Sequence, residues 1–195
     1  QPLRTGIGMR LQAAVLTLSI ILLGASTGST DEWPKWRGPH DDNRSRETQW
    51  ELRGDAAGPN LAWECSVGVG FSSIVVGNGK AFTVGNEDGE DIVSCIDVND
   101  GSFVWQVRYT APLDDRDFEG GPTATPTLDQ NRLYVISREG DLNCFEATTG
   151  RRVWHQQIVD VTDVRLPGWG FSAAPYVVGD RLIVNAGESG VAFDK

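Results

Sequence analysis

The sequence predicts an all-β chain built from repeated four-stranded antiparallel units. One stretch occurs twice, as Cys95–Trp105 and Cys144–Trp154, and its Cys, acidic, Gly, Val and Trp positions recur 49 residues later. The same register extends outward to Pro126 and Pro175. Short β-rich runs alternate with turns that contain Gly and Asn, and no stretch after residue 30 has a sustained helical period. A fixed period of this length is typical of propellers, solenoids and other repeat arrays.

Each copy of the repeated stretch reads as two strands joined by a tight turn. A short apolar strand ends at an acidic residue, whose carboxylate can accept hydrogen bonds from the N–H groups of the turn. A Gly four residues later suits the positive φ that such a turn needs. The next strand carries a Trp, whose ring is large enough to anchor one sheet on its neighbour. The alternative is a generic hairpin with a buried Trp. The docking residues are Asp97, Gly101 and Trp105 in the first copy and Glu146, Gly150 and Trp154 in the second.

This pattern resembles the tryptophan-docking motif of pyrroloquinoline quinone (PQQ) repeat β-propellers. That quinoprotein-like family includes the quinoprotein alcohol dehydrogenases and the propeller lipoprotein of the bacterial outer-membrane β-barrel assembly machinery. The resemblance covers about residues 61–195 and implies an incomplete β-propeller of four-stranded antiparallel blades. The segment Trp33–Pro39 also looks like the opening of secreted bacterial PQQ-repeat proteins of unassigned function. The repeat specifies a fold better than an activity, because one fold hosts many functions.

The chain of 195 residues divides into four regions. Residues 1–8 are interpreted as upstream or non-native sequence. Residues 9–30 are interpreted as a signal peptide, because a basic start, a short apolar run and small residues follow in that order. An uncleaved anchor is the alternative. Residues 31–60 form a lead segment. Residues 61–195 hold a closing strand, two blades and part of a third, so we expect a fragment, since closed propellers have about four to eight blades.

A cleaved signal peptide predicts a periplasmic or secreted protein of the bacterial cell envelope, with no membrane span after cleavage. No Cys follows the apolar run, so a lipoprotein anchor is not expected. The formal net charge of −10 argues against nucleic acid and anionic membranes as partners. Cys95 and Cys144 occupy the same slot of successive repeats and are expected to be buried and inert, whereas Cys65 has no evident partner.

The lead segment is polar but contains Trp33, Trp36 and Trp50, which linkers rarely carry. We expect it to lie across the propeller with these rings as anchors, and a sugar-stacking platform is the alternative. Trp63 is assigned to the closing strand. The expected strands are Ser72–Val76, Lys80–Val84, Ile92–Asp97 and Phe103–Tyr109 in the first blade, Thr123–Leu128, Arg132–Ser137, Leu142–Glu146 and Arg152–Ile158 in the second, and Ala173–Val178 and Arg181–Ala186 in the third.

No catalytic set is visible in the sequence, and no metal site is expected. The acidic clusters at 87–91, within an expected polar loop Gly85–Asp91, and at 114–117 lack the alternating spacing of a calcium loop and read as solvated loops. No role is expected for His40 or His155. The adjacent cysteine pair that the resemblance would imply for a methanol-oxidising quinoprotein is absent.

Two functions follow from these observations. The first is a non-enzymatic PQQ-like repeat propeller that acts as a binding or scaffold platform, with an envelope protein or a small-molecule or glycan ligand as its partner. The alternative is a PQQ-dependent oxidoreductase resembling the quinoprotein alcohol dehydrogenases. Only that alternative brings PQQ and calcium as cofactors.

The connections between blades predict where a ligand would bind. Residues 110–122 and 159–171 each join an outer strand to the next inner strand, and a shorter stretch precedes the first inner strand. These segments should lie on one face near the central channel, where rigidly held loops commonly carry function. The alternative is that their glycines only let the chain turn sharply. The candidate residues of such a binding funnel are Phe71, Arg116, Arg165 and Trp169. The arginines would pair with carboxylates of a ligand, and the aromatic rings would stack on a planar or sugar group.

Overall fold

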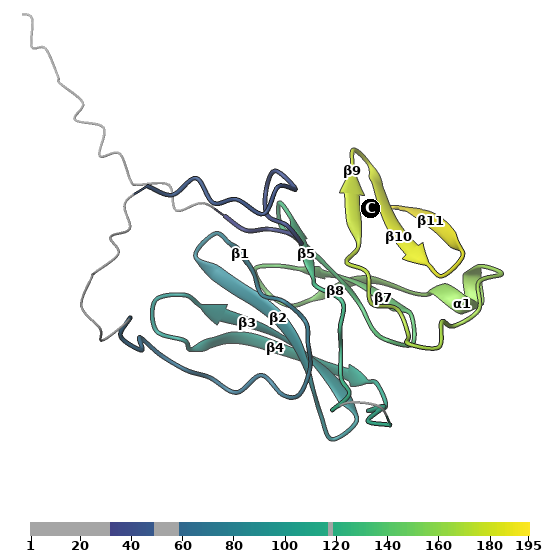
Figure 1. The fold of residues 1–195 in the computed structure, drawn as a ribbon, viewed down its shortest axis with the longest axis horizontal. Coiled ribbons are helices and arrows are strands. Elements are labelled where there is room, and N and C mark those ends of the chain that lie inside the picture. Colours follow the sequence, from purple (N-terminus) through teal and green to yellow (C-terminus); the bar gives the residue numbers. More distant parts are fainter. Residues whose placement is uncertain (1–31, 49–58, 117–118) are drawn as a thin grey trace, which may run out of the picture.

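Three antiparallel β-sheets follow one another along the chain in the computed structural model, which describes residues 32–48, 59–116 and 119–195 (Figure 1). The first two sheets have four strands each and the third has three, and strands that are consecutive in sequence pair within each sheet. The predicted all-β propeller fold is therefore confirmed. The expected signal peptide and Trp50 lie outside the described residues. Within those residues, no helix has the length and apolar character needed to cross a membrane.

The first blade comprises β1 (Val75–Gly77), β2 (Lys80–Glu87), β3 (Glu90–Asp97) and β4 (Phe103–Thr110). The turn between β2 and β3 is only Asp88-Gly89, and both residues have positive φ, which matches the twist of the flanking strands. The expected polar loop over residues 85–91 is therefore wrong. β2 and β3 pair in register out to Glu87 and Glu90, because Asp and Gly tolerate the left-handed backbone of a two-residue turn.

The second blade comprises β5 (Thr127–Asp129), β6 (Arg132–Ile136), β7 (Asp141–Glu146) and β8 (Arg152–Gln157). The third comprises β9 (Tyr176–Val178), β10 (Arg181–Ala186) and β11 (Ser189–Asp194). A single helical turn, α1 (Ile158–Val161), follows β8 and begins at the last residue of the expected strand Arg152–Ile158. Ile158 is buried, and the hydroxyl of Thr162 donates to its carbonyl at 2.7 Å. The helical turn therefore places an apolar side chain in the core as the chain leaves the outer strand.

The middle blade is buried on both of its faces. In β6, Leu133 and Val135 pack with the first blade, whereas Tyr134 and Ile136 pack with the third. This alternation follows from the two-residue period of a strand. β1, β5 and β9 are the strands through which neighbouring sheets approach one another, which makes them the inner strands (Figure 1).

Trp105 and Trp154 occupy equivalent positions in successive blades. Trp105 lies opposite Cys95 and Trp154 opposite Cys144, and a register shift follows each pair. Each indole lies 6.0 Å from an aromatic ring on the second strand of its own blade, tilted by 46° at Trp105 and by 43° at Trp154. Both rings are half-buried rather than fully buried, because the outer strands β4 and β8 leave part of each ring in solvent.

Each turn between the third and fourth strands of the first two blades receives a tryptophan from the preceding part of the chain. The indole N–H of Trp105 donates to the carbonyl of Ala147 at 2.9 Å, directly after the acidic residue of the second blade. Trp63 makes the same contact one blade earlier, donating to the carbonyl of Val98 at 3.0 Å. The two contacts are equivalent, so the docking pattern repeats with the blades.

Glycine is needed in these turns for two reasons. The φ of Gly101 is +74° and that of Gly150 is +73°, a region that side chains with a Cβ rarely adopt. A Cβ added to Gly101 would lie 2.7 Å from the ring of Trp63, and one added to Gly150 would lie 2.8 Å from the ring of Trp105. The glycine therefore supplies both the turn and the space for the docked indole.

The acidic residue closes each turn. The carbonyl of Asp97 accepts the N–H of Gly101 at 3.0 Å, and its carboxylate accepts the N–H of Asn99 at 2.9 Å. Hydrogen bonds from Lys80, at 2.6 Å, and from Asn99 lower the pKa of Asp97 to about 2. The carbonyl of Glu146 accepts the turn glycine of its own blade at 2.8 Å.

The segment before β1 covers the outer face of the first blade. Residues 61–67 form no strand in the described part of the chain, and Val69 makes a single antiparallel bridge to Asn86 in β2. The absence of a side chain at Gly85 lets the backbone of this segment approach β2. The assignment of Trp63 to a closing strand stays a prediction, although its ring takes the docking position that Trp105 takes one blade later.

The two repeated cysteines are buried in the core. Burial raises the pKa of both Cys95 and Cys144 to about 11, which keeps their thiols protonated and unreactive near neutral pH. Cys65 is half-buried, and all three are free thiols.

Candidate binding site

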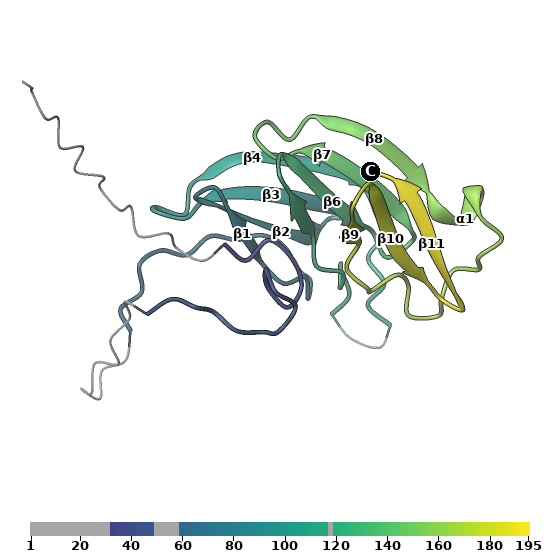
Figure 2. The same ribbon diagram turned by 90° about the horizontal axis from the view of Figure 1, so that it is seen from above.

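The lead segment crosses the inner strands of all three blades. Residues 32–43 of this segment are called the strap here. Trp33 exchanges two backbone hydrogen bonds with β1, at 2.8 and 2.9 Å, and the carbonyl of Pro34 accepts one from β5 at 2.7 Å. In β9, Tyr176 donates its hydroxyl to Asp41 at 2.8 Å. The strap therefore ties the three blades together along their inner strands (Figure 2).

The strap folds through backbone conformations that are rare outside glycine. Arg37, Asp41 and Asn43 have φ values of 71°, 58° and 57°. The N–H of Asn43 donates to the carbonyl of Arg37 at 3.0 Å and closes the loop. Gly38 lies against the ring of Trp33, where an added Cβ would come within 2.9 Å. Non-glycine residues persist in this region only where the surrounding contacts fix them, so the strap is a defined part of the structure.

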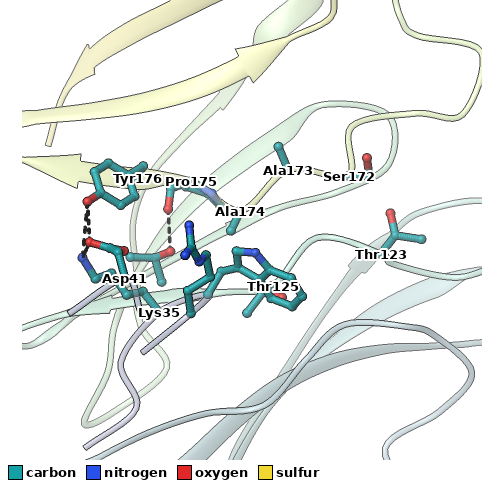
Figure 3. Close-up of a pocket in the computed structure, with 12 residues that line it drawn as sticks. Lys35, Asp41, Thr123, Thr125, Ser172, Ala173, Ala174, Pro175 and Tyr176 are labelled. Carbon is teal, nitrogen blue, oxygen red and sulfur yellow. Dashed lines mark hydrogen bonds and ion pairs between the residues drawn. The ribbon is translucent and has the colours of Figure 1, made fainter. Parts of the chain in front are cut away.

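A pocket of about 600 Å³ lies between the strap and the residues that lead into β5 and β9 (Figure 3). This volume is typical of small-molecule sites, which span about 300–1,000 Å³. Figure 3 shows Lys35 and Asp41 beside Tyr176 at one end, with Thr123 and Ser172 at the other. The lining residues are Lys35, Trp36, Arg37 and Asp41 from the strap, Thr123, Thr125 and Thr127 from the approach to β5 and its first residue, and Ser172, Ala173, Ala174, Pro175 and Tyr176 from the approach to β9 and its first residue.

An ion pair closes one end of the pocket. The ammonium of Lys35 lies 2.8 Å from the carboxylate of Asp41 and 4.7 Å from the centre of the Tyr176 ring. Burial opposes the charge of Lys35, but hydrogen bonds to Asp41 and Tyr176 outweigh it and raise the pKa of Lys35. The hydrogen bond from Lys35 lowers the pKa of Asp41, so both groups are charged at neutral pH.

Hydroxyl groups form another wall. Thr123, Thr125 and Thr127 alternate with Ala124 and Pro126 in the sequence, and all three line the pocket. Thr127 donates to the carbonyl of Pro175 at 2.5 Å and fastens the second blade to the third. The hydroxyl oxygen of Thr123 is buried and has no hydrogen-bond partner among the described residues. A buried hydroxyl without a partner is unfavourable.

The four candidate funnel residues lie outside this pocket. Phe71 and Trp169 have exposed side chains, at 54% and 66% of their full accessible surface. Arg116 makes two contacts of 2.7 Å with the carboxylate of Asp114. Arg165 lines a separate hollow of about 770 Å³ beside the turn between β10 and β11. None of the other three residues lines that hollow.

The connections that carry these residues nevertheless lie side by side. The N–H of Phe71 donates to the carbonyl of Pro122, and the N–H of Phe171 donates to the carbonyl of Arg138, both at 2.8 Å. Arg138 also lies 2.5 Å from the carboxylate of Asp114. Hydrogen bonds from Arg116, with the charge of Arg138, hold the pKa of Asp114 well below its usual range. We call the side of the molecule formed by the connections that carry Phe71, Arg116, Arg165 and Trp169 the connection face.

The acidic cluster at 87–91 is split between two environments. Glu87 lies 2.6 Å from the guanidinium of Arg108 at the surface. Asp91 is buried, and the side-chain amide of Asn86 donates to its carboxylate at 2.9 Å. Burial raises the pKa of Asp91 to about 6, the nearby charge of Glu139 adds to the shift, and the Asn86 hydrogen bond opposes it. These side chains therefore form no common ligand set.

The described residues do not fit a calcium-dependent quinone site. They contain no group of three or more His, Cys, Asp or Glu side chains that could hold a metal ion. The pocket offers hydroxyls and one closed ion pair, whereas calcium binds six to eight oxygen ligands that commonly include several carboxylates. His155 faces Asp141 across β7 and β8 at 2.8 Å, and His40 is exposed on the strap.

Sequence reasoning placed ligand contacts on the connections and missed the pocket. Two signals in the sequence could have found it. The Thr-x-Thr-x-Thr alternation from Thr123 to Thr127 leads into an inner strand. Trp36-Arg37-Gly38 places a large ring, a cation and a turn glycine next to one another in the lead segment. Only the structure shows that these two stretches meet.

The comparisons with known proteins identify what the repeats belong to. A protein-family model described as outer membrane protein assembly factor BamB matches residues 89–195. No curated protein matches the chain.

Several solved structures are similar in fold. The quinohemoprotein alcohol dehydrogenase from Comamonas testosteroni is 23% identical with a TM-score of 0.56, and the match covers 82% of this chain and 24% of that one. A europium-containing methanol dehydrogenase is 20% identical with a TM-score of 0.53, covering 69% of this chain and 25% of that one. BamB from Moraxella catarrhalis is 22% identical with a TM-score of 0.44, and the match covers 62% of this chain and 32% of that one. The chain thus spans about a quarter to a third of the length of these structures.

Proposed function

We propose that this chain, which belongs to the PQQ-repeat β-propeller family of outer membrane protein assembly factor BamB, is part of a non-enzymatic binding platform of the bacterial cell envelope. In this proposal the blades form a rigid scaffold, and recognition takes place where other segments lie across them. A periplasmic or secreted location is part of the proposal, and the order of basic, apolar and small residues in the first 30 positions supports it.

The observation that carries the proposal is the position of the strap. It runs along the inner strands of all three blades and supplies one wall of the pocket. The pocket is lined by aromatic rings, hydroxyls and a closed ion pair, which suits recognition of a polar ligand. Its one carboxylate, Asp41, is bound by Lys35 and Tyr176, so it is a poor general base.

The connection face is proposed as a second contact surface for a larger partner. Phe71 and Trp169 expose their rings there, Arg165 adds positive charge, and Arg116 adds a guanidinium that is paired with Asp114. Aromatic and arginine side chains are enriched in protein interfaces. A photo-crosslinking amino acid at position 169 should capture an envelope protein in cells, whereas one at position 103, exposed on β4, should not. Equal capture from both positions would count against this surface.

A reconstitution experiment separates the platform from the oxidoreductase. The full-length protein is mixed with PQQ and calcium, desalted, and examined for retained quinone absorbance and for dye reduction with methanol or glucose. A PQQ-dependent alcohol dehydrogenase treated in the same way is the positive control. The proposal expects neither retained quinone nor dye reduction. Quinone retained in a one-to-one ratio, together with dye reduction, would overturn it.

A further inference from the structure

We infer that the pocket beneath the strap binds a neutral saccharide of a few pyranose units. This inference rests on the proposed platform function and names the ligand class for it. It uses the pocket described above and no residue of the connection face.

Two aromatic rings offer stacking surfaces at the pocket. Trp36 is 57% exposed and Tyr176 is 40% exposed, although both line the pocket. Large rings that are exposed beside a polar cavity can pack against the C–H faces of a sugar ring, while the sugar hydroxyls point toward polar groups. The strap fixes the backbone next to Trp36, since Arg37 and Gly38 both have positive φ.

The polar lining matches the hydrogen-bonding needs of sugar hydroxyls. Each sugar hydroxyl both donates and accepts, so a site for several of them must mix donors with acceptors. The carboxylate of Asp41 accepts, the guanidinium of Arg37 donates, and the hydroxyl of Ser172 does both.

The lining of the pocket lacks the cluster of cations that would bind a phosphate or a polyanion. Lys35 is matched by Asp41 at 2.8 Å, which leaves Arg37 as the one cation of the lining without an acidic partner at ion-pair distance in the described residues. The chain as a whole carries a net charge of −10, which repels anions. The lining also contains no helix N-terminus, the feature that commonly binds phosphate.

The test is a calorimetric titration of the full-length protein with cellotriose, maltotriose and chitotriose in separate experiments. We expect at least one trisaccharide to bind with a dissociation constant of a millimole per litre or tighter. Trp36→Ala should weaken that binding by about tenfold or more, because it removes the stacking surface. Trp36→Phe should restore most of the affinity, because it returns an aromatic ring. Phe103→Ala is the matched control, since it removes an exposed ring on β4 and should leave the affinity unchanged.

Three outcomes would overturn the inference. They are the absence of trisaccharide binding at millimolar concentration, an affinity that Trp36→Ala leaves unchanged, and a loss of affinity on Trp169→Ala in place of Trp36→Ala. Because Trp36 is mostly exposed, an unchanged melting temperature should show that Trp36→Ala is folded. If the protein instead oxidises a bound sugar in the presence of PQQ and calcium, the non-enzymatic platform fails while the saccharide site stands. If no sugar binds and no quinone is retained, the saccharide inference alone fails.

Discussion

Gly150→Ala should destabilise the propeller far more than the same change at Gly79. Both glycines have positive φ, +73° and +69°, so each substitution adds a Cβ in the left-handed region at a cost of about 1–2 kcal/mol. Nothing lies within 4 Å of a Cβ at Gly79, whereas one at Gly150 lies 2.8 Å from the ring of Trp105. The clash would move that ring away from Ala147. A half-buried Trp contributes to the free energy of unfolding about half of the ~3–5 kcal/mol of a fully buried one. We therefore expect about 3–4 kcal/mol for Gly150→Ala.

A double-mutant cycle isolates the docking contact. Urea unfolding of the full-length protein, followed by circular dichroism, measures the free energy of each variant. In a Trp105→Ala background the clash is absent, so Gly150→Ala should cost no more than Gly79→Ala, and the two changes should be non-additive by about 1–2 kcal/mol. If Gly150→Ala is as mild as Gly79→Ala in the wild-type background, the indole does not occupy the turn and the docking account is refuted.

The remaining predictions concern stability, pH, thiol reactivity and export. Trp105→Ala should cost about 1.5–2.5 kcal/mol in urea unfolding, while Trp105→Phe should cost only about 1 kcal/mol, because it loses mainly the hydrogen bond. The folded-state pKa of Asp91, about 6, lies above its unfolded value, so its contribution to stability is greatest below pH 4 and is lost as pH rises through 6. Asp91→Asn should remove this loss, gaining up to about 3 kcal/mol relative to wild type between pH 4 and pH 7, and parallel pH profiles would contradict it. A thiol reagent should label Cys65 before the two buried cysteines, as checked by peptide mass spectrometry. N-terminal sequencing of the mature protein should find cleavage between Ala25 and Thr30, and a retained Met9 would contradict it.

The blades were predictable because their determinants are local and repeated. The acidic residue, the glycine and the Trp of each copy stand at fixed spacing, and the structure gives Trp105 and Trp154 matching cross-strand partners. Where the prediction failed, the cause was short-range turn chemistry. Asp88-Gly89 is a two-residue turn signal, but its acidic neighbours made the stretch look like a longer polar loop.

The pocket could not be predicted in the same way, because it depends on segments far apart in the sequence. Asp41 contacts Tyr176, 135 positions away, and no repeat or periodic pattern links them. The half-burial of Trp105 was also hidden, since the sequence gives the type of a residue but not the exposure of the strand that carries it. Packing between distant segments therefore determines the candidate site, whereas the repeat determines the scaffold.

The most direct test of the central claim is hydrogen–deuterium exchange of the full-length protein with cellotriose, maltotriose and chitotriose, and separately with PQQ and calcium. The account predicts that the bound saccharide slows exchange in the strap and in the approaches to β5 and β9, residues 123–127 and 172–176, while the quinone changes nothing. Protection by PQQ and calcium, centred on the inner strands or the connections at 68–71 and 168–171, would contradict the account and favour the oxidoreductase.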